Sequence, residues 1–212
     1  MRAHADVDAV TLDALGTLVR LRDPVPALRA ALQARGIERG DEVVRRAFQA
    51  VVAHYKPRCA AGRDDESLAA LREECVGVFL REAGAELEPE SFVEAFVGAL
   101  AFEPEPGAEE AVDRLAAAGV PLAVVSNWDM SLEGMLAELG LAGHLRAVVT
   151  SAAAGASKPD PAIFTPALAA LGSTPQRTLH VGDEAVDEDG AAAAGLQFRP
   201  APLAAVAAEL LG

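Results

Sequence analysis

The sequence has few aromatic residues, few basic residues and only two cysteines, and each shortage excludes a class of protein. Phe, Trp and Tyr make up 4% of 212 residues, so a surface that stacks nucleic-acid bases on aromatic rings is not expected. Lys and Arg number 18 against 32 Asp and Glu, and the net charge of −14 argues against binding to nucleic acid or an anionic membrane. Cys59 and Cys75 form no CxxC pattern, so neither a zinc site nor a disulfide framework is predicted.

Long apolar runs are also missing. No apolar stretch reaches about 18 residues, and no basic leader precedes an apolar segment near the N-terminus. We therefore expect a cytoplasmic protein without a membrane span. The hydrophobic fraction of 51% nevertheless predicts a folded chain with a sizeable core.

Helical periodicity fills one continuous stretch, from Pro26 to about Leu100, and four helices are expected there. The segment Glu103–Gly107 then alternates acidic residues with prolines, which is typical of a hinge. Outside this stretch, short apolar runs typical of buried strands alternate with helical segments. The expected strands are residues 7–12, 121–125, 147–150, 177–181 and 196–198.

Strands separated by helices predict an α/β fold with a doubly wound, mostly parallel sheet. We place the α/β core at residues 1–19 and 105–212 and an inserted helical domain at residues 20–104. In such a sheet, ligands bind at the carboxyl ends of the strands. Asp13, Ser126 and Asp183 each follow or end an expected strand, so we expect them to form one site.

A nucleophile and its partners can be read from these residues. A carboxylate such as Asp13 can attack phosphorus or an alkyl carbon and form a covalent ester, although an Asp after a strand is more often a turn residue. Lys158, in a rigid proline-rich stretch, is a candidate for neutralising it. Ser126 and Asn127 can offer a hydroxyl and amides to an anion, or can cap a helix. Trp128 either lines the pocket or packs in the core.

A metal site is suggested by Asp183 and Asp187. Together with Asp13 they would place three carboxylates against one lysine, and a hard cation such as Mg²⁺ would balance the excess charge. The alternative is a pair of solvated acidic residues at a helix start. His180 lies within an expected buried strand, so we predict that it packs in the core.

The four segments around Asp13, Ser126, Lys158 and Asp183 resemble, in order, the four motifs of the haloacid dehalogenase-like hydrolase superfamily, subfamily IA. The helical insert resembles the cap of that family. Three runs look most like its rhythmically-expressed-protein-like branch: Gly16–Arg22, Ser126–Asp129 and Lys158–Phe164. The resemblance implies a Rossmann-like core and a Mg²⁺-dependent phosphohydrolase that acts on a small phosphorylated molecule.

The resemblance also implies a role for each matching residue. Asp13 would be the nucleophile, forming an aspartyl-phosphate, and also a metal ligand, with the Leu15 carbonyl oxygen as a second ligand. Ser126 and Lys158 would hold the phosphoryl oxygens, and Lys158 would also restrain Asp13. Asp183 would bind Mg²⁺ directly. Asp187 would lie close by, acting directly or through water or Lys158.

Leu15 departs from the phosphatase pattern, which has a second Asp at this position to protonate the leaving group. General acid–base catalysis contributes roughly 10² to 10⁴ in rate, so we expect slow turnover of ordinary sugar phosphates and a smaller penalty for aryl or acyl phosphates. Glu184 is a candidate substitute acid. Two alternatives stay open: a 2-haloacid dehalogenase, which needs no acid there but works without metal, and a catalytically weak anion-binding or regulatory protein.

Overall fold

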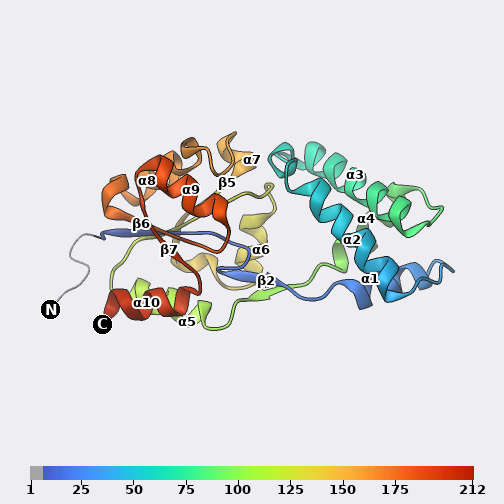
Figure 1. The fold of residues 1–212 in the computed structure, drawn as a ribbon, viewed down its shortest axis with the longest axis horizontal. Coiled ribbons are helices and arrows are strands. Elements are labelled where there is room, and N and C mark those ends of the chain that lie inside the picture. The colour runs from blue at the N-terminus through green and yellow to red at the C-terminus, as the bar shows by residue number, and fades with distance from the viewer. Residues whose placement is uncertain (1–6) are drawn as a thin grey trace. The chain divides into compact units, whose positions relative to one another are not determined.

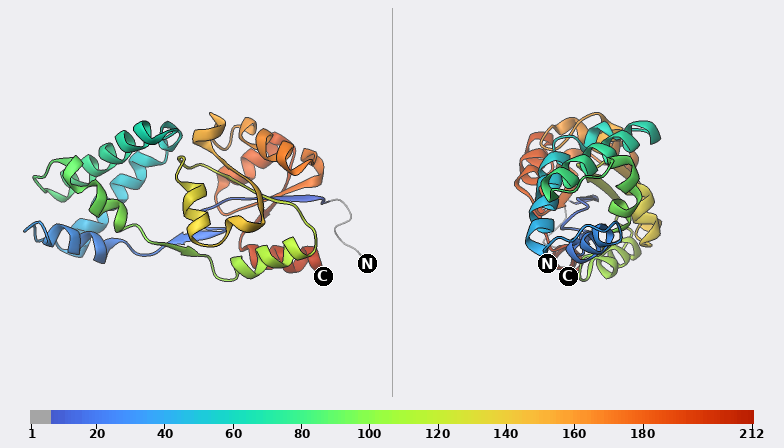
Figure 2. Two further views of the ribbon diagram at one scale, coloured as in Figure 1. Left: turned by 180° about the vertical axis from the view of Figure 1, so that it is seen from behind. Right: turned by 90° about the vertical axis from the view of Figure 1, so that its right-hand side faces the viewer.

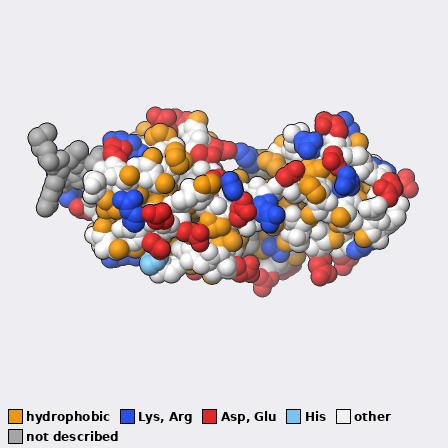
Figure 3. Space-filling model, turned by 90° about the horizontal axis from the view of Figure 1, so that it is seen from below, with side chains coloured by type: hydrophobic (Ala, Val, Ile, Leu, Met, Phe, Trp, Pro, Cys, Tyr) orange, Lys and Arg blue, Asp and Glu red, His pale blue; other side chains and the backbone are white. Residues whose placement is uncertain are grey.

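The computed structural model describes residues 7–212, and the chain divides into two units (Figures 1 and 2). One unit consists of the residues up to Arg20 together with Glu103–Gly212, and the other is Leu21–Phe102. Residues 1–6 of the predicted core lie outside the described residues. No described helix is long and apolar enough to cross a membrane. Acidic and basic side chains are interspersed on the face of each unit that Figure 3 shows.

The first unit is built on a five-stranded sheet in the order β5-β4-β1-β6-β7, whose paired strands are all parallel. The central strand β1 is buried at every position, as expected of a strand covered on both faces. The predicted doubly wound α/β fold is therefore confirmed. The strands are β1 (Ala9–Leu12), β4 (Leu122–Ser126), β5 (Leu145–Thr150), β6 (Thr178–Gly182) and β7 (Gln197–Pro200).

Helices cover both faces of this sheet. In Figure 1, α8 and α9 lie above it, and α5 and α10 lie below it. Apolar side chains from β1, β4 and β5 pack against α8 and α9 in one buried cluster that includes Val125 and Phe164. The helices are α5 (Ala108–Ala117), α6 (Leu132–Glu138), α7 (Ser151–Ala154), α8 (Phe164–Leu171), α9 (Ala185–Ala194) and α10 (Leu203–Leu211), with 3₁₀ turns at Ala142–His144, Pro161–Ile163 and Pro175–Arg177.

The second unit is helical and has its own apolar core. The rings of Phe79 and Phe96 lie 5.2 Å apart between centroids, and Phe79 stacks on Phe92 at 6.1 Å. Asp64 and Ser67 form a capping box at the start of α3, which satisfies backbone N–H groups that the helix itself leaves without partners. The helices are α1 (Val25–Gln33), α2 (Asp41–Tyr55), α3 (Asp65–Ala83) and α4 (Val93–Gly98), with 3₁₀ turns at Cys59–Ala61 and Pro89–Phe92.

The chain passes between the units through two short strands that pair with each other, β2 (Val19–Leu21) and β3 (Phe102–Pro104). Arg20 and Glu103 form an ion pair across them at 2.8 Å. The predicted hinge at Glu103–Gly107 begins where the division between the units falls, but its first two residues belong to β3 and are not irregular. A three-residue strand is too short to show the alternation by which strands are predicted, and Pro104 is a residue that sheets admit only at an edge or end.

Candidate active site

The predicted site residues lie at the carboxyl edge of the parallel sheet. Asp13 directly follows β1, Ser126 is the last residue of β4, and Asp183 directly follows β6. β1 pairs with both β4 and β6, so these three positions are neighbours at one edge. Asp13 and Ser126 are buried, whereas Asp183 is exposed. This is the edge at which open α/β sheets bind their ligands.

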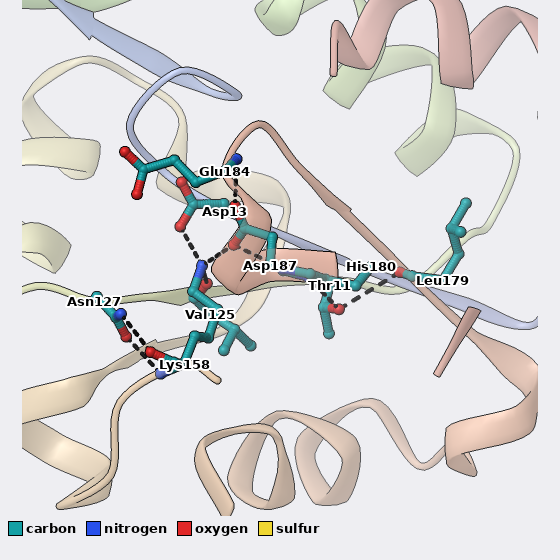
Figure 4. Close-up of polar contacts among 9 residues, drawn as sticks. All are labelled: Thr11, Asp13, Val125, Asn127, Lys158, Leu179, His180, Glu184 and Asp187. Atoms are coloured by element: carbon teal, nitrogen blue, oxygen red, sulfur yellow. Dashed lines mark hydrogen bonds and ion pairs between the residues drawn. The ribbon is translucent and has the colours of Figure 1, made fainter. Parts of the chain in front are cut away.

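Lys158 is the centre of the site (Figure 4). The side chain is buried, and its ammonium group donates to Asp13 Oδ1 at 2.5 Å, to the Val125 carbonyl oxygen at 2.9 Å and to Asp187 Oδ1. A lysine ammonium has three hydrogens, so each of them has an acceptor. A buried cation needs such pairing because its lost hydration is otherwise uncompensated. The predicted contact between Lys158 and Asp13 is therefore present.

Asn127 holds the backbone of Lys158. Its Nδ2 donates to the Lys158 carbonyl oxygen at 3.0 Å, and its Oδ1 accepts from the Lys158 N–H at 2.7 Å. Figure 4 shows the two bonds side by side. This side chain thus joins the loop after β4 to the segment that carries Lys158, a role that the sequence analysis missed. A contact between Asn127 and substrate stays a prediction.

Asp187 lies in the first turn of α9, and both of its oxygens have partners. Oδ1 accepts from Lys158 and lies 3.3 Å from His180 Nε2, while Oδ2 accepts from the Glu184 N–H at 3.0 Å. Burial opposes ionisation of this carboxyl group, but the hydrogen bond from His180 and the positive charge of Lys158 outweigh it. Together they hold the pKa of Asp187 well below its usual range. Asp187 is therefore an anion that Lys158 and His180 stabilise.

His180 is fully buried in β6, as the sequence predicts, and it also makes polar contacts. Its Nδ1 lies 3.0 Å from Thr11 Oγ1, and its ring meets the ring of Phe164 edge-on at 5.0 Å between centroids. Burial is the main cause that lowers the pKa of His180, because it disfavours the charged imidazolium. The ring is thus a neutral group that links β1 to Asp187.

The pKa of Asp183 shifts in the opposite direction to that of Asp187. Partial desolvation, followed by the negative charges of Asp13, Asp187 and Glu184, raises the pKa of Asp183 to about 6. Asp13, Asp183 and Asp187 each offer an oxygen within 4.8 Å of the others. One lysine cannot neutralise three carboxylates, so this donor set fits a hard divalent cation. Coordination by the Leu15 carbonyl oxygen stays a prediction.

Two glycines make room for these carboxylates. A Cβ atom on Gly16 would lie 2.2 Å from Asp183 Oδ2, and one on Gly182 would lie 2.3 Å from Asp187 Cγ. Gly16 also has a φ of +84°, in the left-handed region that other residues rarely adopt. Both positions therefore require glycine, a requirement that the sequence analysis did not identify.

Leu15 and Trp128 differ in exposure. Leu15 lies in the turn after β1, and 40% of its surface is exposed. Phosphatases of the family that this sequence resembles have an acid at this position. Trp128 is 9% exposed, and its carbonyl oxygen accepts from Ser151 Oγ at 3.0 Å. A role for Trp128 in substrate binding stays a prediction, and its burial favours packing.

Replacing Asp183 with Asn should stabilise the metal-free protein at pH 7 and remove one ligand of the predicted Mg²⁺ site, so we expect added Mg²⁺ to stabilise the variant less than the wild-type protein. The raised pKa means that ionised Asp183 disfavours the folded state. The penalty grows as the pH rises from about 4 to about 6 and is constant above that. Water screens this exposed side chain, so we expect a gain of about 1 kcal/mol.

Thermal unfolding in EDTA and in Mg²⁺ measures both effects. Asp189→Asn, at an exposed position on α9, is the matched control, and a destabilised Asp183→Asn protein in EDTA would contradict the assignment.

Replacing Asn127 with Ala should lower the free energy of unfolding by about 1–3 kcal/mol, because the part-buried N–H and C=O groups of Lys158 lose their partners. Urea unfolding measures the change. Gln197→Ala is the control, since that side-chain amide donates to a backbone carbonyl at an exposed position, Gln176. An Asn127→Ala effect no larger than that of Gln197→Ala would show that the two bonds do not stabilise the fold.

Comparisons with known proteins agree with this geometry. The family model of haloacid dehalogenase-like hydrolases matches residues 7–195. Mouse haloacid dehalogenase-like hydrolase domain-containing protein 3 is 33% identical over 198 residues, covering 88% of this chain and 78% of the mouse protein. The human protein of that name is 45% identical over 91 residues, which are 42% of this chain and 36% of the human protein.

Enzymes with two different activities are among the similar proteins. A phosphoglycolate phosphatase of Mesorhizobium japonicum is 35% identical over 94 residues, covering 44% of this chain and 41% of that protein. The structure of an L-2-haloacid dehalogenase from Xanthobacter autotrophicus has a TM-score of 0.68 and 27% identity over 91% of this chain and 76% of that chain. Because the family match runs from β1 through α9, and so includes Asp13, Lys158 and Asp187, this chain belongs to the haloacid dehalogenase-like hydrolase family.

Proposed function

We propose that this hydrolase is a Mg²⁺-dependent phosphohydrolase that acts on a small phosphorylated molecule through an aspartyl-phosphate at Asp13. One observation carries the proposal: three carboxylates each offer an oxygen within 4.8 Å of the others, and a single buried ammonium group pairs with only two of them, Asp13 and Asp187. Such a cluster has excess negative charge before any substrate binds. A divalent cation is the partner that makes it compatible with an incoming phosphate.

The roles of the side chains follow from their contacts. Lys158 binds Oδ1 of Asp13 and so orients the carboxylate, leaving Oδ2 to attack the phosphorus. As the new bond to Asp13 forms, the bond from phosphorus to the leaving oxygen breaks, and water later cleaves the aspartyl-phosphate. Ser126 and Lys158 would hold the phosphoryl oxygens. When bound by Asp13 and Asp183, Mg²⁺ would supply positive charge that offsets the repulsion between carboxylate and phosphate.

Leu15 determines which phosphates react well. Its side chain has no proton to give, so the leaving oxygen must depart as an anion or take a proton from another group. Aryl and acyl phosphates have leaving groups that are stable as anions, and we propose these as the favoured substrate class. Glu184, exposed beside Asp183, is a candidate acid. Unchanged activity in Glu184→Ala would remove it from consideration.

Dehalogenation of a small 2-haloacid is the second candidate. The similarity to the Xanthobacter autotrophicus dehalogenase and the missing acid at Leu15 favour it, since halide leaves without a proton. The carboxylates of Asp183 and Asp187 count against it, because they would repel an anionic haloacid. A third candidate is an anion-binding or regulatory protein with weak catalysis.

The first test is release of p-nitrophenol from its phosphate ester, with Mg²⁺ and with EDTA. We expect turnover that needs Mg²⁺ and that Asp13→Asn abolishes, because the amide is a far weaker nucleophile. Asp189→Asn is the control and should retain activity. Hydrolysis that persists in EDTA and in Asp13→Asn would contradict the proposal. If no p-nitrophenol is released, chloride release from 2-chloropropionate distinguishes the dehalogenase from the binding protein.

Replacing Leu15 with Asp should accelerate hydrolysis of alkyl phosphates far more than that of p-nitrophenyl phosphate. A restored general acid is worth roughly 10² to 10⁴ in rate where the leaving oxygen needs a proton. The ratio of the two kcat/KM values measures the effect. Leu15→Asn is the matched control, since it has a similar shape and polarity but no titratable proton. Equal ratios in the two variants would show that the missing acid does not limit turnover.

A further inference from the structure

Asp187 has a partner that the proposed mechanism does not use. His180 lies on β6, beneath the site, and its Nε2 is 3.3 Å from the same oxygen, Oδ1, that accepts from Lys158. Behind the ring, Thr11 Oγ1 lies 3.0 Å from Nδ1. Figure 4 shows Thr11, His180, Asp187 and Lys158 in one continuous line of polar contacts that ends at Asp13.

The directions of these hydrogen bonds follow from the chemistry of the groups. The Asp187 carboxylate can only accept, so Nε2 must carry the hydrogen. A neutral imidazole then has its lone pair on Nδ1, which must accept a hydrogen bond. The Thr11 hydroxyl is the donor at 3.0 Å. Its other acceptor, the Leu179 carbonyl oxygen, is farther away at 3.5 Å, so the geometry favours donation to the ring.

Packing holds the ring in this orientation. Thr11 and His180 are directly paired across the parallel strands β1 and β6, and both are fully buried. The rings of Phe164 and Phe198 lie 5.0 and 6.4 Å from the imidazole between centroids. Since the ring is buried from bulk solvent, its polar partners are the neighbouring side chains, Thr11 on β1 and Asp187 on α9. A buried nitrogen without a partner would destabilise this arrangement.

We propose that Thr11 and His180 are positioning residues for Lys158. The Thr11 hydroxyl fixes His180 as the Nε2–H tautomer, and that N–H orients Asp187 so that its Oδ1 holds the Lys158 ammonium beside Asp13. The relay deepens the proposed phosphohydrolase function and rests on it for its kinetic consequence. The tautomer itself follows from the contacts and from the full burial of the ring, which disfavours a charged imidazolium.

Nitrogen-15 NMR of the histidine rings in the metal-free protein tests the relay without any substrate. Spectra of His180→Gln identify the His180 signals. We expect the Nε2–H tautomer in the wild-type protein and in Thr11→Ser, and a shifted Nδ1 signal in Thr11→Val, which cannot donate. Thr178→Val removes another buried hydroxyl from the same sheet and should leave the His180 signals unchanged. An Nδ1–H tautomer in the wild-type protein, or a Thr11→Val spectrum identical to it, would overturn the proposal.

Kinetics with p-nitrophenyl phosphate test the consequence for Lys158. Thr11→Val removes a hydrogen bond between two neutral groups. The loss of such a bond corresponds to about 2- to 10-fold, and we expect a fall of this size in kcat/KM for Thr11→Val but not for Thr11→Ser or Thr178→Val. In His180→Gln, the amide can donate to Asp187 without help from Thr11. Adding Thr11→Val to that variant should therefore change kcat/KM little. A full additional loss in the double variant would show that Thr11 acts by packing alone.

The outcomes of the two experiments distinguish failure of the relay from failure of the proposed function. A wild-type protein with no phosphatase activity would overturn the phosphohydrolase, while the NMR result would still decide whether the relay exists. Active protein with the wrong tautomer would overturn the relay and leave the phosphohydrolase standing. If a variant fails to fold, the tautomer of the wild-type protein decides the relay by itself.

Discussion

The site depends on one buried ammonium group. Lys158 is separated from Asp13 by 145 positions in the chain and from Asp187 by 29, yet its three hydrogens join both carboxylates and the end of β4. Removing a charge from water is expensive, and only close anions with good geometry compensate for it. The burial of the lysine therefore depends on a fold that brings the ends of β1 and β4 and the start of α9 together. Conversely, the Lys158 ammonium group compensates for the hydration that the two buried carboxylates, Asp13 and Asp187, lose.

The surroundings shift the pKa values of two carboxylates in this cluster in opposite directions. Asp187 is buried between a lysine and a histidine, and its pKa falls. Asp183 is exposed, faces mainly other anions, and its pKa rises to about 6. The cluster thus has one carboxylate that protein partners bind and another whose ionised form is disfavoured by its surroundings. This difference in pKa follows from where the two residues lie, because their side chains are chemically identical.

The sequence predicted the sheet and the placing of Asp13, Ser126 and Asp183 at its carboxyl edge, because both depend on local patterns. Short apolar runs between helical segments identify parallel strands, and polar residues at their ends identify the edge where ligands bind. The contacts of Asn127 and Thr11 were not predictable in this way. Thr11 meets His180 only because β1 and β6 pair in one particular register, and Asn127 reaches Lys158 through the path of a loop. Such contacts depend on long-range geometry that no window of sequence contains.

The pairing of β2 with β3 has a consequence for how the helical insert is joined to the core. Both passages of the chain run through one two-stranded ribbon, so the two ends of the insert are held together at its stem. A segment with pinned ends behaves as a closed loop, and the entropy of closing a loop rises only slowly with its length. The stability of the α/β core therefore depends on the paired strands β2 and β3 and only weakly on the number of residues in the insert. Inserts of different length could be exchanged at this point with little change in the stability of the core.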